Sequence, residues 1–155
     1  MLPYVAVDGN LITAQNPGSV AKAAEAMVLA LGLPVSARQP FSDEQTMSLI
    51  SQARQNGPVV IDLALQQPEH NIDINYLALY GFYAYRLASD ADKAQELAIM
   101  HTISKHFSHP EFDAQLVLQS LEQGLTAQAK AVYQQFVQRY PEHQYVSTLK
   151  TKLIE

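Results

Sequence analysis

The residues that decide the fold are 71–90, NIDINYLALYGFYAYRLASD, near the middle of the 155-residue chain. Apolar and aromatic side chains occupy nearly every position, and no regular polar face is left. A helix that is apolar almost all round is usually buried at the centre of a domain. The segment therefore predicts a central, buried helix around which the rest of the chain packs.

The segments on both sides of this helix predict further helices. Helical spacing of apolar residues, interrupted by turn residues, marks 42–57, 91–107, 111–124, 126–140 and 143–155. Residues 58–71, PVVIDLALQQPEHN, fit either a short buried strand or a helix, and we favour a helix because no companion strand follows. Helices of this length joined by short turns are typical of antiparallel helical hairpins.

One pair of helices has a more specific pattern. A small residue, Ala129, is followed by Tyr133, Phe136 and Pro141, and Gly124 lies at the turn before them. This spacing resembles the second helix of a tetratricopeptide (TPR) repeat, and residues 74–141 as a whole resemble TPR-type helical hairpins. The preceding helix lacks the Trp and the Leu-Gly pair of the consensus. The resemblance implies a helical array that acts by binding protein.

The N-terminal residues 4–32, YVAVDGNLITAQNPGSVAKAAEAMVLALG, have a different character. Asp8-Gly9-Asn10 separates two short β-prone runs, which predicts a hairpin. Ser19 is placed to cap a following helix, which Gly32 ends. The helix carries an apolar stripe of Ala21, Ala24, Met27, Val28 and Leu31. We expect a hairpin-helix segment at 1–33, a proline-containing linker at 34–41 and a helical domain at 42–155.

The text DGNLITAQNPGS of this segment resembles the C-terminal end of the PfpI/ThiJ family, within the class I glutamine amidotransferase-like superfamily. The resemblance implies a hairpin and helix that complete a flavodoxin-like α/β sheet. The activity of that family depends on a cysteine at a nucleophile elbow upstream of this segment, whereas this chain has no cysteine. No catalytic residue is therefore carried over from the family.

Together these patterns predict a mainly α fold. A short N-terminal β-hairpin plus helix is followed by an irregular antiparallel helical array with TPR-like hairpins. A two-stranded hairpin alone is barely stable in water, and its edges expose unpaired backbone groups. We expect the hairpin to pack on the helical part, to fray, or to pair with a partner's sheet.

Composition excludes several functions. The net charge is −5, and the Lys and Arg residues are scattered singly, so we expect no nucleic-acid partner. No signal peptide and no apolar run of membrane-spanning length are present, so we expect no membrane partner and a cytoplasmic, bacterial-type protein. Without cysteine there is no disulfide and no thiolate ligand.

Two sets of residues are candidate ligand-binding sites. Tyr76, Tyr80 and Tyr83 lie at i, i+4 and i+7 on one helix face, which suits either a binding groove or a core stripe. Asn16 and Ser19 flank the start of the first helix, where free N–H groups suit an anion or a simple helix cap.

The histidines do not form a convincing metal motif. His101, His106 and His109 are close in sequence, with Glu111 nearby, but the helix end before Pro110 separates their directions. We therefore expect no metal site, no cofactor and no catalytic residues.

The sequence thus favours a non-catalytic protein-interaction module, which binds a protein partner or self-associates through the N-terminal hairpin. The alternative is a part of a PfpI/ThiJ-type hydrolase or amidase whose nucleophile-bearing portion lies upstream or on another chain. A third reading, a small-molecule sensor, rests on the tyrosine stripe alone.

Overall fold

The computed structural model describes residues 2–154. In this part of the chain the strands are β1 (Val5–Asp8) and β2 (Leu11–Ala14), followed by the 3-10 helix η1 (Pro17–Ser19) and the helices α1 (Val20–Ala30), α2 (Ser42–Asn56), α3 (Val59–Leu65), α4 (Ile74–Leu87), α5 (Lys93–Ile103), α6 (Pro110–Glu122), α7 (Thr126–Arg139) and α8 (Tyr145–Lys152). The predicted mainly α class with an N-terminal hairpin is confirmed. Residues 58–71 contain a helix, α3, as expected.

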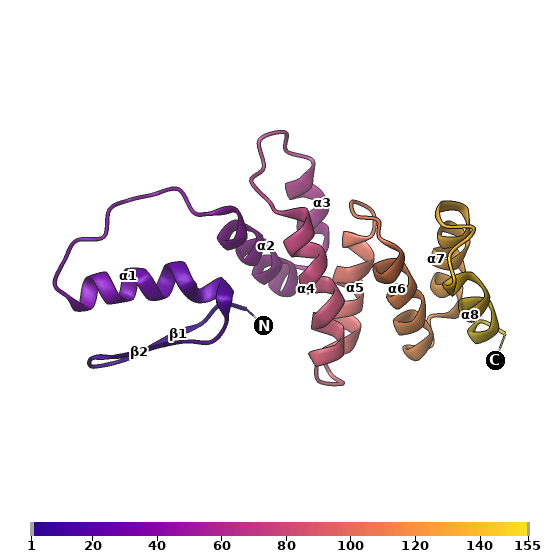
Figure 1. Cartoon of the computed structure of the whole chain (residues 1–155), viewed down its shortest axis with the longest axis horizontal. Coiled ribbons are helices and arrows are strands. Elements are labelled where there is room, and N and C mark those ends of the chain that lie inside the picture. Colours follow the sequence, from indigo (N-terminus) through magenta and orange to yellow (C-terminus); the bar gives the residue numbers. More distant parts are fainter. Residues whose placement is uncertain (1, 155) are drawn as a thin grey trace.

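The molecule is elongated, with two unequal parts (Figure 1). We call residues 2–33 the N-terminal lobe; it consists of β1, β2, η1 and α1, with α1 running alongside the hairpin. Residues 42–154 form the helical array, in which α2–α3, α4–α5 and α6–α7 pack as successive pairs and α8 closes the end. The lobe lies at one extremity of the molecule and the C-terminus at the other.

The hairpin forms because its turn contains residues that accept unusual backbone angles. Asp8 pairs with Leu11 across a two-residue turn, and Gly9 has a φ of 56°. Such positive angles are natural for glycine and are required by the turn types that join twisted strands. The two-stranded antiparallel sheet has no third strand among the described residues.

The array contains two hydrophobic clusters that meet at α6. The larger one gathers buried side chains of α2 to α5 around α4, including Ile50, Leu77 and Ile103. The smaller one lies between α6, α7 and α8 and contains Phe136 and Leu149. Helix α6 is buried on two sides, since its side chains contribute to both clusters. Residues 71–90 thus contain the central helix that their composition predicts.

Two local devices set the helix positions in the array. The Asp73 carboxylate caps α4 by accepting hydrogen bonds from the Asn75 and Tyr76 N–H groups, both at 3.0 Å. A Cβ atom at Gly81 would lie 2.9 Å from Cδ1 of Ile103, so the glycine permits close approach of α5 to α4.

No helix among residues 2–154 combines the length and apolar character needed to cross a membrane.

Candidate functional site

The most unusual feature of the structure is the amount of apolar surface on the N-terminal lobe. Large apolar side chains that are 50–75% exposed cover it: Tyr4, Val7, Leu11, Val20, Met27, Leu29, Leu31 and Leu33. Among its described apolar residues, only Ala23 is fully buried. Exposed apolar patches of more than a few hundred square ångströms are uncommon on monomers and mark sites of association. We call this set of side chains the lobe surface.

Helix α1 presents a continuous part of the lobe surface. Val20, Ala24, Met27 and Leu31 follow the spacing i, i+4, i+7 and i+11, which places them on one helix face. All four are exposed. Of the stripe expected from the sequence, Ala24, Met27 and Leu31 are exposed. Ala21 and Val28 are partly buried and line a hollow together with residues of the linker.

The hairpin offers a second kind of contact, through its backbone. The N–H of Gln15 donates to the carbonyl of Tyr4 at 3.0 Å, so position 4 bonds inward to β2. Hydrogen-bonded and non-bonded pairs alternate along an antiparallel ladder. The backbone groups of Val5 and Val7 on β1 therefore point away from β2, and those of Ile12 and Ala14 on β2 point away from β1. Both edges of the sheet are open to another strand.

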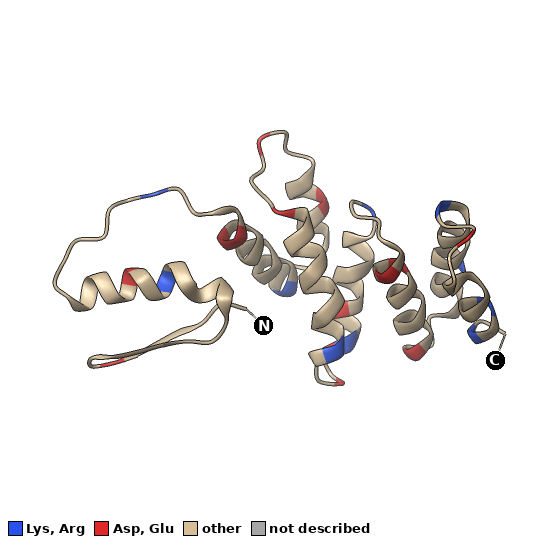
Figure 2. Cartoon of the chain, viewed as in Figure 1, with Lys and Arg blue, Asp and Glu red and all other residues tan. Residues whose placement is uncertain are grey.

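Charge is nearly absent from the lobe. Asp8, Lys22 and Glu25 are the only charged side chains in residues 2–33. Figure 2 shows the lobe almost free of coloured residues, whereas charged positions are spread along the array. The lobe therefore offers apolar area and backbone groups for contact, and little charge.

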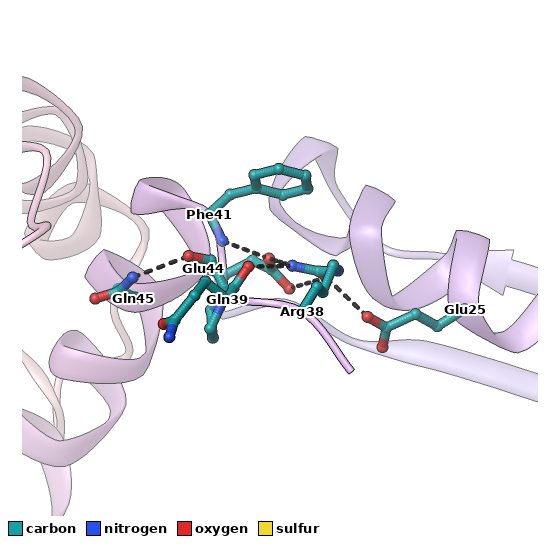
Figure 3. Close-up of polar contacts among 7 residues, drawn as sticks. Glu25, Arg38, Gln39, Phe41, Glu44 and Gln45 are labelled. Carbon is teal, nitrogen blue, oxygen red and sulfur yellow. Dashed lines mark hydrogen bonds and ion pairs between the residues drawn. The ribbon is translucent and has the colours of Figure 1, made fainter. Parts of the chain in front are cut away.

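Arg38 in the linker holds the lobe against the array (Figure 3). Its guanidinium donates to Glu25 of α1 at 2.8 Å and to both carboxylate oxygens of Glu44 of α2 at 2.6 and 2.9 Å. The group also lies 4.6 Å from the ring centroid of Phe41. The hydrogen bond from Arg38 lowers the pKa of Glu44. One linker side chain thus connects the last helix of the lobe to the first helix of the array.

The Glu44 carboxylate also accepts a hydrogen bond from the N–H of Phe41 at 2.9 Å, and this bond caps the start of α2.

The two candidate ligand sites from the sequence meet at the junction of lobe and array. A Cβ atom at Gly18 in η1 would lie 3.0 Å from the Tyr76 hydroxyl oxygen, so this hydroxyl lies directly against the loop. Burial raises the pKa of Tyr76. A groove of about 660 Å³ opens beside this contact, and Leu2, Lys22, Gln45 and Met47 are among its lining residues.

Ser19 does not cap α1 as the sequence suggested. It occupies the N-cap position, but its side chain makes no capping hydrogen bond to the helix. Its Oγ instead accepts the N–H of Tyr4 at 3.0 Å and donates to the Asn16 Oδ1 at 3.4 Å. The Asn16 Nδ2 donates to the carbonyl of Leu2 at 3.2 Å. These side chains tie the start of β1 to η1, and that competing long-range bond is why the local cap is absent.

The three tyrosines of α4 have three different surroundings. The Tyr80 hydroxyl is buried and donates to the Glu96 carboxylate, whose oxygens lie 3.1 and 3.3 Å away. Arg54 Nε lies 3.0 Å from the same carboxylate, and burial raises the pKa of both Glu96 and Tyr80. Tyr83 is exposed and packs edge-on to Phe82. The predicted stripe therefore divides into a junction residue, a core residue and a surface residue.

The histidines are separated in the same way. His106 Nε2 lies 2.6 Å from Asp62 Oδ1, and His101 Nε2 lies 3.0 Å from Ser120 Oγ. The ring of His109 stacks on Phe107. Within residues 2–154, no three His, Cys, Asp or Glu side chains are grouped in a way that could hold a metal ion.

The lobe surface and Arg38 are the features that sequence reasoning missed. The sequence predicts an apolar stripe on α1, but it does not show that Ala24, Met27 and Leu31 are left exposed. Arg38 lies in a segment that reads as a linker in the sequence, and only the structure shows that it contacts the carboxylates of Glu25 and Glu44. Comparisons with protein-family models, with curated proteins and with solved structures gave no match for this chain.

Proposed function

We propose that the protein is a non-catalytic protein-interaction module that binds its partner through the N-terminal lobe. The observation that carries this proposal is the lobe surface, a set of large apolar side chains that the described chain leaves exposed. Covering such surface on association is favourable by roughly 25 cal/mol per square ångström, before the cost of association is subtracted.

The open hairpin edges indicate how a partner would bind. An added strand gains backbone hydrogen bonds from the edge, and its side chains select the partner. Strand addition together with contact on the α1 stripe uses both features of the lobe in one interface. The TPR resemblance of residues 74–141 supports the same class of function for the array. We include a cytoplasmic location in this proposal. A chain without cysteine forms no disulfide and therefore does not need an oxidising compartment.

Site-specific photo-crosslinking in cells that express the protein tests the proposal. In one variant a photoreactive amino acid replaces Met27 on the lobe surface. In the matched control it replaces Leu87 on α4, a side chain that is 69% exposed. We expect a discrete protein adduct from position 27 and none from position 87. Equal labelling at both positions, or no protein adduct at position 27, would refute a specific binding surface on the lobe.

The PfpI/ThiJ resemblance gives the alternative function, in which the lobe completes the sheet of a hydrolase or amidase. The open edges of β1 and β2 favour this alternative too, since they fit a sheet supplied by another protein domain. The adduct from position 27 distinguishes the two. An adduct with an α/β protein that bears a nucleophilic cysteine, and that loses hydrolytic activity without the lobe, supports the alternative.

A further inference from the structure

We propose that the partner of the lobe is a second copy of this chain, paired through the edge of β1 to form a four-stranded antiparallel sheet. This inference rests on the proposed function of the lobe and adds the identity of its partner. The β1 edge is chosen because α1 packs more against β2 than against β1, which leaves β1 the less covered strand.

The backbone of β1 is complementary to itself. A two-fold axis through Ala6 places Val5 opposite Val7 of the second copy, and Val7 opposite Val5. Because Val5 and Val7 point their N–H and C=O groups outward, each of these two pairs exchanges two hydrogen bonds. The pairing therefore forms four backbone hydrogen bonds and disturbs none within either hairpin. No proline or charged residue interrupts Val5–Val7 to block it.

The same axis brings the two α1 helices together. A two-fold axis perpendicular to the sheet keeps both helices on one face, each beside its own hairpin. The midlines of the hairpins are then two strand spacings apart, or about 9.6 Å. Packed helices lie about 8–10 Å apart. Because α1 lies nearer to β2 than to β1, the two helix axes are farther apart than the two midlines, and any contact between the helices is made by the larger side chains of the exposed stripe.

Charge fits this occupant, and part of the lobe surface contributes contact area. The α1 stripe supplies Val20, Met27 and Leu31, each with roughly 100 Å² of exposed side chain, whereas Leu29 lies on the opposite side of α1. With Asp8, Lys22 and Glu25 as its only charged residues, the lobe meets little repulsion from an identical lobe.

Cysteine cross-linking tests the register, since the natural chain contains no cysteine. In the proposed pairing the two Ala6 Cα atoms are about 4.5 Å apart, within the range of about 4.4–6.8 Å that a disulfide spans. We expect Ala6→Cys to form a covalent dimer under mild oxidation, doubling the mass from 17.2 kDa. The matched control is Thr13→Cys, which lies opposite Ala6 within the hairpin and belongs to the other edge. It should remain monomeric on a denaturing gel.

A second pair of variants covers the case in which a new cysteine disturbs the hairpin. Val7→Pro removes an outward N–H from the β1 edge, and Ile12→Pro removes one from the β2 edge, at positions that face each other in the hairpin. In sedimentation velocity the unmodified chain and Ile12→Pro should be dimers, whereas Val7→Pro should sediment as a monomer.

Each outcome has a definite meaning. A cross-link at Thr13→Cys and not at Ala6→Cys, or dimer loss in Ile12→Pro alone, overturns the β1 pairing. A monomeric unmodified chain with no cross-link overturns the second copy as partner. In that case a photo-adduct from Met27 to a different protein would leave the proposed function standing, and the absence of any adduct would remove both.

Discussion

Replacing Phe136 with alanine should destabilise the C-terminal end of the array more than the rest. Phe136 is fully buried in the smaller cluster, and its ring lies 5.1 Å from that of Tyr140 and 5.8 Å from that of His143. Removing a buried phenyl ring typically costs about 3–5 kcal/mol. Because the array is built as successive helical pairs, we expect α7 and α8 to bear most of this loss.

The matched variant is Phe112→Ala, which removes the same ring from the face of α6 that belongs to the larger cluster. Hydrogen exchange measured by mass spectrometry reports the local opening of each helix. A loss of 3–5 kcal/mol corresponds to exchange that is roughly 100- to 5,000-fold faster. We expect this acceleration in α7 and α8 for Phe136→Ala, and across α4 to α6 for Phe112→Ala. Identical acceleration from α2 to α8 in both variants would refute the division of the array into two clusters.

Three further predictions concern charge and hydrogen bonding. Arg38→Ala should broaden the distribution of distances between spin labels on the lobe and on α2. Acidification should do the same, because the folded state lowers the pKa of Glu44 from 4.5. The stabilisation that the Glu44 carboxylate provides is therefore complete above pH 4.5, and it is lost as the pH falls through the pKa of Glu44 in the folded protein. An unchanged distribution in both cases would contradict the linking role of Arg38. Burial lowers the pKa of His101 from 6.5, so its contribution to the free energy of unfolding is complete above pH 6.5 and falls below that pH. His101→Gln should therefore flatten the pH dependence of the urea midpoint. Parallel curves for the variant and the unmodified protein would contradict this prediction. Tyr80→Phe removes the donor to the buried Glu96 carboxylate and should lower the free energy of unfolding in urea by about 1.5–3 kcal/mol. Tyr83→Phe, at an exposed position, should change it by about 0.5 kcal/mol or less. Equal losses in the two variants would contradict a stabilising role for the buried hydrogen bond.

Local pattern was enough to predict most of the elements. The Asp8-Gly9-Asn10 turn predicts the hairpin because its backbone requirement is local, and Gly9 meets it. The apolar composition of residues 71–90 likewise predicts a central helix, because few other positions can bury so much apolar surface.

The candidate sites were less predictable, because each depends on a contact distant in sequence. Spacing places Tyr76, Tyr80 and Tyr83 on one face, but cannot show that a carboxylate of α5 meets one hydroxyl and η1 another. Ser19 has the identity of a helix cap, yet the N–H of Tyr4 occupies its oxygen. A helical stripe likewise predicts that a face is apolar and not what covers it.

The lobe lies at one end of the elongated molecule, and this position affects which surfaces can be bound at the same time (Figure 1). If the lobe binds a partner as proposed, that partner sits at one end of the molecule and does not cover the array from α3 to α8. A second protein bound to the array would then lie at a distance from the first that the length of the array sets, with the Arg38 ion pairs at the joint between the two parts.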